Sequence, residues 1–291
     1  MAEESHRPGV DVVVPFAGSA AALRELVARL EALELASGDT LTIVDNRPPG
    51  AEDVDGVLRA PERQSSYFAR NRGAAGGSNP WLVFLDADVE PAGDLVQRYF
   101  DEPASEQTAV LAGGVADQAI DGQGAGSMAA RYTMLRASMS QANTLLDGPW
   151  SYAQTANCAI RRSAFEAVGG FCDHVRSGGD ADICFRLRAA GWSIESRERA
   201  LVVHRSRASL RKLLRQQARH GAGAAWLSRE HPGSFAAASL PGLAKWTLGS
   251  LARAASAAAR GRRDTALVTG MDPLVKWAFE LGRLFPNEMR G

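Results

Sequence analysis

The sequence predicts an α/β domain with an open, largely parallel sheet, followed by a helical extension at its C-terminal end. Two observations support this fold class. Short apolar runs alternate with helical patterns through the first third of the chain, which is typical of strands joined by right-handed helical crossovers. Several of these runs end in carboxylates or amides, which should gather at the sheet edge where open α/β sheets bind ligands.

The most informative segment is the predicted strand 81–85 with the acidic residues after it. The strand is apolar throughout, as expected when both faces are buried. Asp86 and Asp88 follow it, and Pro91 is expected to end the strand and open a helix. On an extended chain the two carboxylates point to the same side and can hold a divalent cation or a ribose hydroxyl. A plain acidic turn has the same pattern, so both interpretations stay open.

The other elements of the first half follow the same alternation. Strands are predicted over 10–16, 41–44 and 57–59, and helices over 19–35, 65–75 and 94–100. The strand ends at Phe16, Asp45 and Asp86 should therefore share one sheet edge and form a nucleotide-sized crevice. Neither GxGxxG after the first strand nor GxxxxGK[ST] is present, which disfavours a dinucleotide fold and a P-loop.

Composition narrows the class of protein. The chain is 45% hydrophobic, and its 33 basic residues balance its 33 acidic ones, so we expect no nucleic-acid partner. The three cysteines show no paired spacing and are expected to be reduced thiols. With no signal peptide and no membrane-spanning apolar run, we expect a cytoplasmic protein, with a peripheral position on the inner membrane face left open. Residues 1–9 are expected to be a disordered leader.

The C-terminal part is basic and helical. Between 197 and 263 the only acids are Glu198 and Glu230. A helix over 209–220 should turn its cations outward, toward a phosphate-bearing acceptor, a lipid headgroup or solvent; these cations are Arg211, Lys212, Arg215 and Arg219. We expect a main domain over 10–230 and a helical extension over 231–291, with helices within 235–259 and over 273–285. The extension either packs on the domain or docks on a membrane or in a homodimer.

Several segments, in order, resemble the family two glycosyltransferases of the GT-A fold. They are VVVPFAG, IVDN, ARNRGA and VFLDADVE, followed by acceptor-side and catalytic segments at 154–171 and 177–192. The resemblance covers roughly residues 10–223. It implies a Rossmann-like nucleotide-sugar-binding domain with a mixed central sheet, a nucleotide-sugar donor, a divalent metal and transfer with inversion.

The resemblance also implies a donor site. Pro15 and Phe16 match the lining of the base pocket, and Asp45 matches the residue that accepts a hydrogen bond from a uracil-type base. Arg70 and Asn71 match the donor-side Arg-Asn pair. Without the resemblance, Asp45 reads as a turn residue and Arg70 as a surface cation equally well. The donor implied is a UDP-sugar.

A metal site and one acceptor-side residue complete the implied set. Asp86 matches the residue near the ribose, and Asp88 the ligand of Mn²⁺ or Mg²⁺. His204 follows a predicted strand, and the resemblance implies that it completes the metal site with these two acids or contacts the diphosphate. Asn157 lies in the acceptor-side segment and is expected to contact the cofactor. A metal bridging the diphosphate would neutralise the charge of the leaving group.

Two carboxylates compete for the role of general base. Apolar spacing predicts a helix starting near Asp182, with Asp180 in the Gly-rich loop before it. Asp180 occupies the position of the family's catalytic acid and is the expected base, while Asp182 suits a helix cap. One departure is Gly179, where the family usually has an acid.

Two other functions fit parts of the sequence. Asp86-Ala-Asp88 also fits the nucleophile motif of haloacid-dehalogenase-type phosphatases. That fold needs the nucleophile on its first strand and a lysine between its two acidic motifs, but here at least two predicted strands come first and the first lysine of the chain is Lys212. The second alternative is a non-catalytic relative that binds a nucleotide sugar, motivated by Gly179. Hydrolysis or transfer of the donor would separate these alternatives.

Overall fold

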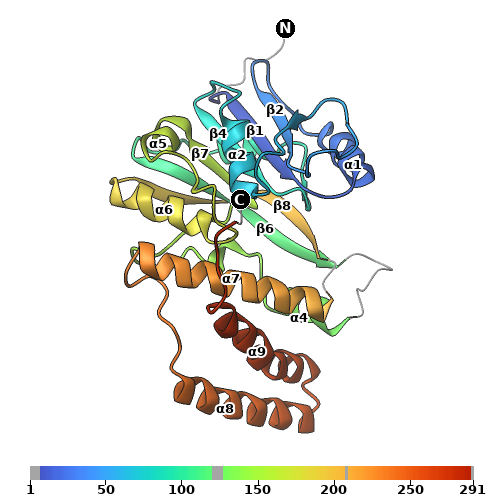
Figure 1. Ribbon diagram of the computed structural model, residues 1–291, viewed down its shortest axis with the longest axis vertical. Coiled ribbons are helices and arrows are strands. Elements are labelled where there is room, and N and C mark those ends of the chain that lie inside the picture. Colours follow the sequence, from blue (N-terminus) through green and yellow to red (C-terminus); the bar gives the residue numbers. More distant parts are fainter. Residues whose placement is uncertain (1–6, 120–126, 207–208, 290–291) are drawn as a thin grey trace.

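A mixed eight-stranded sheet forms the centre of the computed structural model, which describes residues 7–119, 127–206 and 209–289 (Figure 1). The strand order is β3-β2-β1-β4-β7-β6-β8-β5. The strands are β1 Val10–Phe16, β2 Thr40–Asp45, β3 Leu58–Arg59, β4 Trp81–Leu85, β5 Val89–Pro91, β6 Thr108–Ala119, β7 Asn157–Arg161 and β8 Ser193–Ser206. The first four strands in the order are parallel, and β7 is antiparallel to both of its neighbours. The predicted α/β class with a mixed sheet is confirmed.

The helices start where the sequence offers capping hydroxyl groups. Ser19, Ser65, Ser209 and Ser239 each accept a backbone N–H in the first turn. The helices are α1 Ala20–Leu30, α2 Ser66–Ala74, α3 Leu95–Tyr99, α4 Met128–Leu135, α5 Arg162–Ala167, α6 Gly179–Ala189, α7 Leu210–Glu230, α8 Leu240–Ala259 and α9 Arg263–Gly282, with a 3₁₀ turn η1 at Gln141–Asn143.

Two apolar clusters form the core, one on each face of the sheet. The alternation along β1 divides its valines between them, with Val12 and Val14 in one cluster and Val13 in the other. Helices α1 and α3 contribute to the first cluster, and α2, α5 and α6 to the second. Because β3, β2, β1 and β4 are parallel, their C-terminal ends lie at one edge of the sheet. Helix α7 runs along this edge (Figure 1).

Some local expectations are corrected. Pro91 belongs to β5, which pairs only with β8 at the sheet edge, so its missing N–H leaves no ladder bond unmade. The C-terminal helix begins at Arg263, with Pro273 inside it. Helix α7 extends to Glu230, past the expected end near 220. Of the expected leader, residues 1–6 lie outside the described residues, whereas the buried Arg7 side chain pairs with Asp39 at 2.5 Å.

The C-terminal helices form a separate layer below the sheet edge. Helix α9 packs between α7 and α8, which leaves α8 as the outermost element (Figure 1). After α9 the chain returns to the main domain, where Asn287 donates to the carbonyl of Ser177 and Glu288 bridges to Val175. Within the described residues, none of the helices is both long and apolar enough to cross a membrane.

Candidate active site

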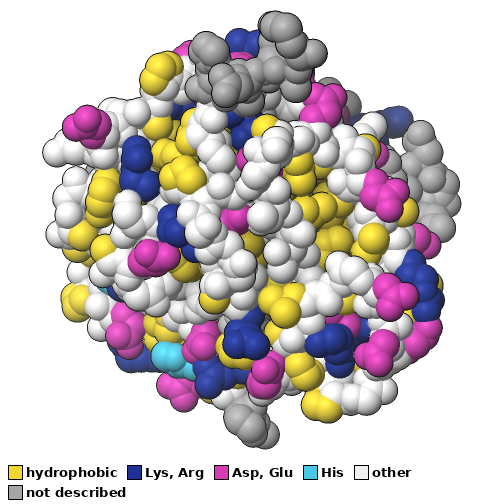
Figure 2. Space-filling view, turned by 90° about the horizontal axis from the view of Figure 1, so that it is seen from above, with side chains coloured by type: hydrophobic (Ala, Val, Ile, Leu, Met, Phe, Trp, Pro, Cys, Tyr) yellow, Lys and Arg dark blue, Asp and Glu magenta, His cyan; other side chains and the backbone are white. Residues whose placement is uncertain are grey.

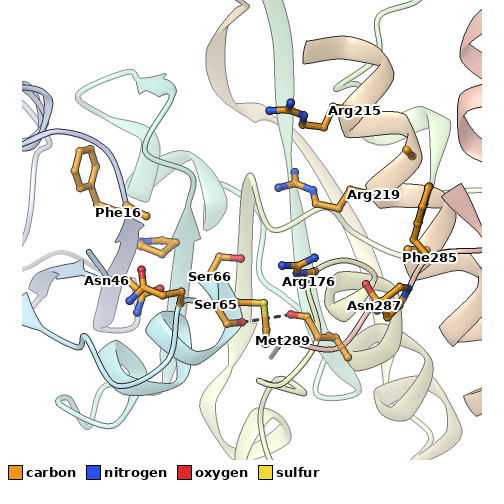
Figure 3. Close-up of a pocket in the computed structure, with 17 residues that line it drawn as sticks. Phe16, Asn46, Ser65, Ser66, Arg176, Arg215, Arg219, Phe285, Asn287 and Met289 are labelled. Atoms are coloured by element: carbon orange, nitrogen blue, oxygen red, sulfur yellow. Dashed lines mark hydrogen bonds between the residues drawn. The ribbon is translucent and has the colours of Figure 1, made fainter. Parts of the chain in front are cut away.

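Two adjoining pockets lie between the sheet edge and α7. The larger, of about 760 Å³, has Phe16 and Asn46 on the sheet side and three arginines across from them (Figure 3). Arg215 and Arg219 project from α7, and Arg176 from the loop before α6. Pro15 also lines this pocket, so the structure brings both expected base-pocket residues to it.

The second pocket, of about 460 Å³, shares Ser66, Arg176 and Arg219 with the first. It contains Asp86 and Asp180, two of the acids expected in the site. The two pockets together form one cleft, with a cationic and apolar end and a polar end that carries carboxylates. A cleft of this kind matches the needs of a ligand with an aromatic ring, phosphates and a sugar.

Arg70 holds Asp86 at the end of β4. The guanidinium of Arg70 is ion-paired with the Asp86 carboxylate, and its side chain is only 4% exposed. It lies 5.7 Å from the ring centroid of Tyr67 and 6.0 Å from that of Phe171, within the range of cation–π attraction. Asp86 is thus oriented by a buried cation whose own position is set by two aromatic rings.

Asp180 lies in the first turn of α6, so the expectation that it precedes the helix is wrong. The hydroxyl of Tyr67 donates to Oδ1 at 2.6 Å, and the backbone N–H of Thr155 donates to Oδ2 at 3.2 Å. Burial and the adjacent Asp180 carboxylate raise the pKa of Tyr67 well above its usual value, so Tyr67 remains a donor. The Asp180 carboxylate is therefore held by both oxygens at the wall of the second pocket.

Asp182 has a different environment. Its side chain is 6% exposed and pairs with Arg186 at 2.7 Å and with Nε2 of His231 at 2.9 Å. His231 caps the end of α7, so these contacts tie α6 to α7. Asp182 lines neither of the two pockets. The structure therefore separates the two competing carboxylates, with Asp180 at the cleft and Asp182 in a buried ion-pair network.

Gly179 lies against the ring of Tyr67. A Cβ atom at this position would come within 2.7 Å of ring atoms Cε1 and Cζ, closer than a side chain can approach. The missing acid and the aromatic residue are therefore linked, because Tyr67 occupies the space that a side chain at position 179 would need. Its hydroxyl reaches Asp180 from that same space.

Asp88 and His204 lie together at the end of the sheet. Asp88 is not on an extended strand with Asp86 but in the turn before β5, and its carboxylate faces Nε2 of His204 at 3.4 Å. On its other side, Nδ1 of His204 lies 3.0 Å from Asp117, whose side chain is 2% exposed. Burial disfavours the charged imidazole, but Asp117 and Asp88 outweigh this effect and raise the pKa of His204 to about 10.

These contacts decide which residues fit a divalent metal. Asp86 is engaged by Arg70, and among the described residues no three acidic, histidine or cysteine side chains are arranged around a common metal position. Asp88, with a side chain that is 65% exposed, and Nε2 of His204 offer two ligands. A carboxylate on the other imidazole nitrogen is the usual outer partner of a metal-binding histidine. The pair therefore fits a metal that takes its other ligands from phosphate and water.

The structure places two expected donor-site residues away from the cleft. Asp45 is fully buried, with Arg47 and Arg59 paired to its carboxylate at 2.7 and 2.6 Å. The amide of Asn71 instead bonds the backbone of Phe171 in both directions. None of these residues lines either pocket.

Asn157 is likewise part of the core. It is 0% exposed, accepts from the hydroxyl of Tyr99 at 2.6 Å and donates to the carbonyls of Gly114 and Ala200. These bonds engage its carbonyl oxygen and both amide hydrogens, and the residue has no exposed surface to offer a cofactor. Asn157 connects three strands of the sheet in place of the expected cofactor contact.

Four residues of the site carry no sequence signal of their own. Tyr67 and Asp117 reach Asp180 and His204 from distant segments, Arg176 lies in a loop, and His220 is on α7. Burial and Arg219 lower the pKa of His220 to about 4, so this pocket residue is a neutral imidazole near pH 7. Of the four expected cations on α7, the helical spacing predicts that Arg215 and Arg219 share a face, which here is the cleft face.

Comparison with known proteins identifies the family. Residues 81–277 match the model of glycosyl transferase family group 2. The chain is 31% identical over 256 residues to the pre-mycofactocin glycosyltransferase of Mycobacterium tuberculosis. The aligned region covers 85% of this chain and 53% of that protein. It is 30% identical over 172 residues to the glycosyltransferase AglE of Haloferax volcanii, covering 57% of this chain and 53% of that one. The chain thus spans about half the length of these relatives.

Solved structures share the fold. The mannosyltransferase PcManGT from Pyrobaculum calidifontis, in complex with GDP-Man and Mn²⁺, superposes with a TM-score of 0.61 and 16% identity over 97% of this chain and 88% of that one. GalNAc-T7 with UDP, GalNAc and Mn²⁺ gives a TM-score of 0.51 at 15% identity, over 71% of this chain and 45% of that one. The expected GT-A-like fold is confirmed. By the family match and the identity across most of its length, the protein belongs to glycosyl transferase family group 2.

Proposed function

We propose that the protein is an inverting glycosyltransferase that moves a sugar from a UDP-sugar to an acceptor hydroxyl, with Mn²⁺ or Mg²⁺ at Asp88 and His204. The observation that carries the proposal is the cleft. A nucleotide-sized pocket adjoins a polar pocket that contains Asp86 and presents the hydrogen-bonded carboxylate of Asp180 from a helix start. The family membership and the fold support the same class of reaction.

The larger pocket suits the nucleotide part of the donor. Pro15 and Phe16 supply apolar surface for a base. Across the pocket, the described residues offer Arg176, Arg215 and Arg219 no carboxylate partner, so their charges are available to phosphate oxygens. The preference for uracil rests on the sequence resemblance at Asp45 alone. In the structure the Asp45 carboxylate is paired with Arg47 and Arg59 and does not line the pocket.

The smaller pocket suits the transfer step. Asp180 accepts the proton of the acceptor hydroxyl while the hydroxyl oxygen attacks the anomeric carbon from the side opposite the nucleoside diphosphate. The new C–O bond forms as the bond to the diphosphate breaks, which inverts the configuration. Tyr67 and the Thr155 N–H keep the Asp180 carboxylate in place. A divalent ion held by Asp88 and His204 would supply positive charge to the leaving diphosphate.

A non-catalytic relative is the second candidate, motivated by the absence of an acid at position 179. The contact between Gly179 and Tyr67 gives this absence a steric reason that leaves Asp180 at the cleft. Release of free sugar from the donor, or its transfer to any acceptor, would exclude the non-catalytic candidate.

Calorimetric titration of the full chain with UDP and GDP, each with and without Mn²⁺, tests the proposal. We expect UDP to bind more tightly than GDP, and Mn²⁺ to tighten binding in the wild type but not in Asp88→Ala. Asp94→Ala is a matched control, because Asp94 is a half-exposed acid on the same segment whose side chain pairs with Arg98. UDP affinity that is the same with and without Mn²⁺ in the wild type would contradict the metal role.

A further inference from the structure

Helix α8 has an apolar stripe on its outer side that no element of the described chain covers. The stripe comprises residues at spacings of three and four, which places them on one face of the helix: Leu240, Ala244, Leu248, Leu251, Ala255 and Ala259. All six are exposed, and the leucines are exposed by 70%, 70% and 47%. The opposite face carries Leu243, Ser250 and Ala257, which are buried.

This arrangement is unusual for a surface helix, which normally turns polar residues to water. Helix α8 packs on α9 with one side and presents leucines with the other. It is also the element farthest from the sheet, and among the described helices and strands none lies on its outer side (Figure 1). An apolar stripe of this length, left open, indicates an interaction surface.

The charges around α8 favour one kind of partner. From His231 to Arg263 the sequence contains no acid, and its lysine and arginines are all exposed; they are Lys245, Arg253, Arg260, Arg262 and Arg263. At the opposite end of the molecule, positive and negative side chains are interspersed (Figure 2). An excess of exposed cations on the helix that carries these leucines and at its C-terminal end is complementary to an anionic lipid bilayer, where leucines enter the interface and long cationic side chains reach the headgroups.

We infer that the α8 stripe docks the protein on the surface of an anionic lipid bilayer. The helix lies in the interfacial plane without crossing the bilayer. Helix α6, which carries Asp180, lies on the other side of α7 from α8 (Figure 1), so docking leaves Asp180 outside the lipid contact. The inference does not depend on the identity of donor or acceptor.

Vesicle flotation with the full chain tests the inference. Vesicles of phosphatidylcholine are compared with an equal-part mixture of phosphatidylcholine and phosphatidylglycerol, at low and high salt. We expect binding to the anionic vesicles that weakens with salt. The double variant Leu248→Ser/Leu251→Ser should bind about tenfold more weakly, because the transfer of two leucine side chains from water into the bilayer no longer contributes to binding. Lys245→Glu/Arg260→Glu should also lose binding, and the loss should be large only at low salt.

The control is Leu146→Ser, which removes an equally exposed leucine, 63% exposed, from outside the helix. It should bind vesicles like the wild type, and all variants should melt with the wild-type transition. Failure of the wild type to bind anionic vesicles would overturn the inference, as would unchanged binding of the serine variant. A dimer in light scattering that the serine variant abolishes, without vesicle binding, would assign the stripe to a second copy instead.

Discussion

The hydroxyl of Tyr67 donates a hydrogen bond of 2.6 Å to Asp180, across 113 residues of sequence. The bond joins α2 to the start of α6, and it aims one oxygen of the proposed base. In Tyr67→Phe the ring that packs on Gly179 stays, but the donor is lost. We therefore expect turnover to fall about tenfold, with KM for the donor nearly unchanged, because the hydrogen bond positions the base and not the nucleotide. Steady-state kinetics would measure both quantities. A fall in the donor affinity of Tyr67→Phe as large as the fall in its turnover would contradict this role.

The two aspartates of α6 should separate in their effects. Asp180→Asn should bind UDP normally and lose about two to four orders of magnitude in turnover, the range for removal of a general base. Asp182→Asn should retain turnover in the folded protein and lose stability, because Arg186 and His231 lose the charge of their shared partner. Turnover and thermal unfolding of the two variants distinguish these roles. If Asp182→Asn is folded and inactive while Asp180→Asn is active, the roles are exchanged.

Restoring an acid at position 179 should damage the fold. In Gly179→Asp the new Cβ overlaps the Tyr67 ring, which we expect to cost about 1–3 kcal/mol of unfolding free energy, as for other overpacked sites. The double variant Gly179→Asp/Tyr67→Ala should be less destabilised than the sum of its single variants, since the overlap is gone. Denaturant unfolding of all four proteins gives the coupling free energy. Additive effects would show that the contact is not limiting.

Asp117 should support metal binding without being a ligand. Its carboxylate accepts from the backbone of Met139 at 3.1 Å as well as lying against Nδ1 of His204. Asp117→Asn keeps the size of the side chain but removes its charge, so we expect about 10–100-fold weaker Mn²⁺ binding. The bound fraction can be measured by electron paramagnetic resonance in the presence of UDP. The exposed Asp101, paired with Arg199 at 3.6 Å, offers Asp101→Asn as a control that should bind Mn²⁺ normally.

Asp45 should determine part of the acid stability. Burial alone would raise its pKa, but the bonds from Arg47 and Arg59 outweigh burial and lower the pKa from 3.8 to about 2. This stabilisation is complete above pH 3.8 and is lost as the pH falls through about 2. Asp45→Asn should therefore lose about 3 kcal/mol of unfolding free energy at neutral pH, and the difference from the wild type should shrink toward pH 2. Urea unfolding at a series of pH values would measure the difference in unfolding free energy between the two proteins. A difference that stays constant down to pH 2 would exclude this role.

The comparison of Asp180 with Asn157 shows how far a sequence match predicts a site. Both residues lie in segments that resemble the family, yet Asp180 reaches the cleft and Asn157 lies in the core with its amide bonded to its neighbours. A match in sequence places a residue on an element. It does not say whether groups on neighbouring strands form hydrogen bonds with that side chain and hold it in the core.

The amino-acid sequence by itself determined the order of strands and helices in the first half, the apolar faces that form the core, and the family. These follow from periodicity, capping residues and local motifs, which act over a few positions of the chain. The tertiary structure alone decided the partners. It placed Tyr67 on Asp180, put Asp117 87 residues away beside His204, and covered Asp45 with Arg59. The physical reason is that such contacts depend on the register of strands and the packing of helices that lie far apart along the chain. They also depend on which polar groups the fold brings within hydrogen-bond distance of a buried partner.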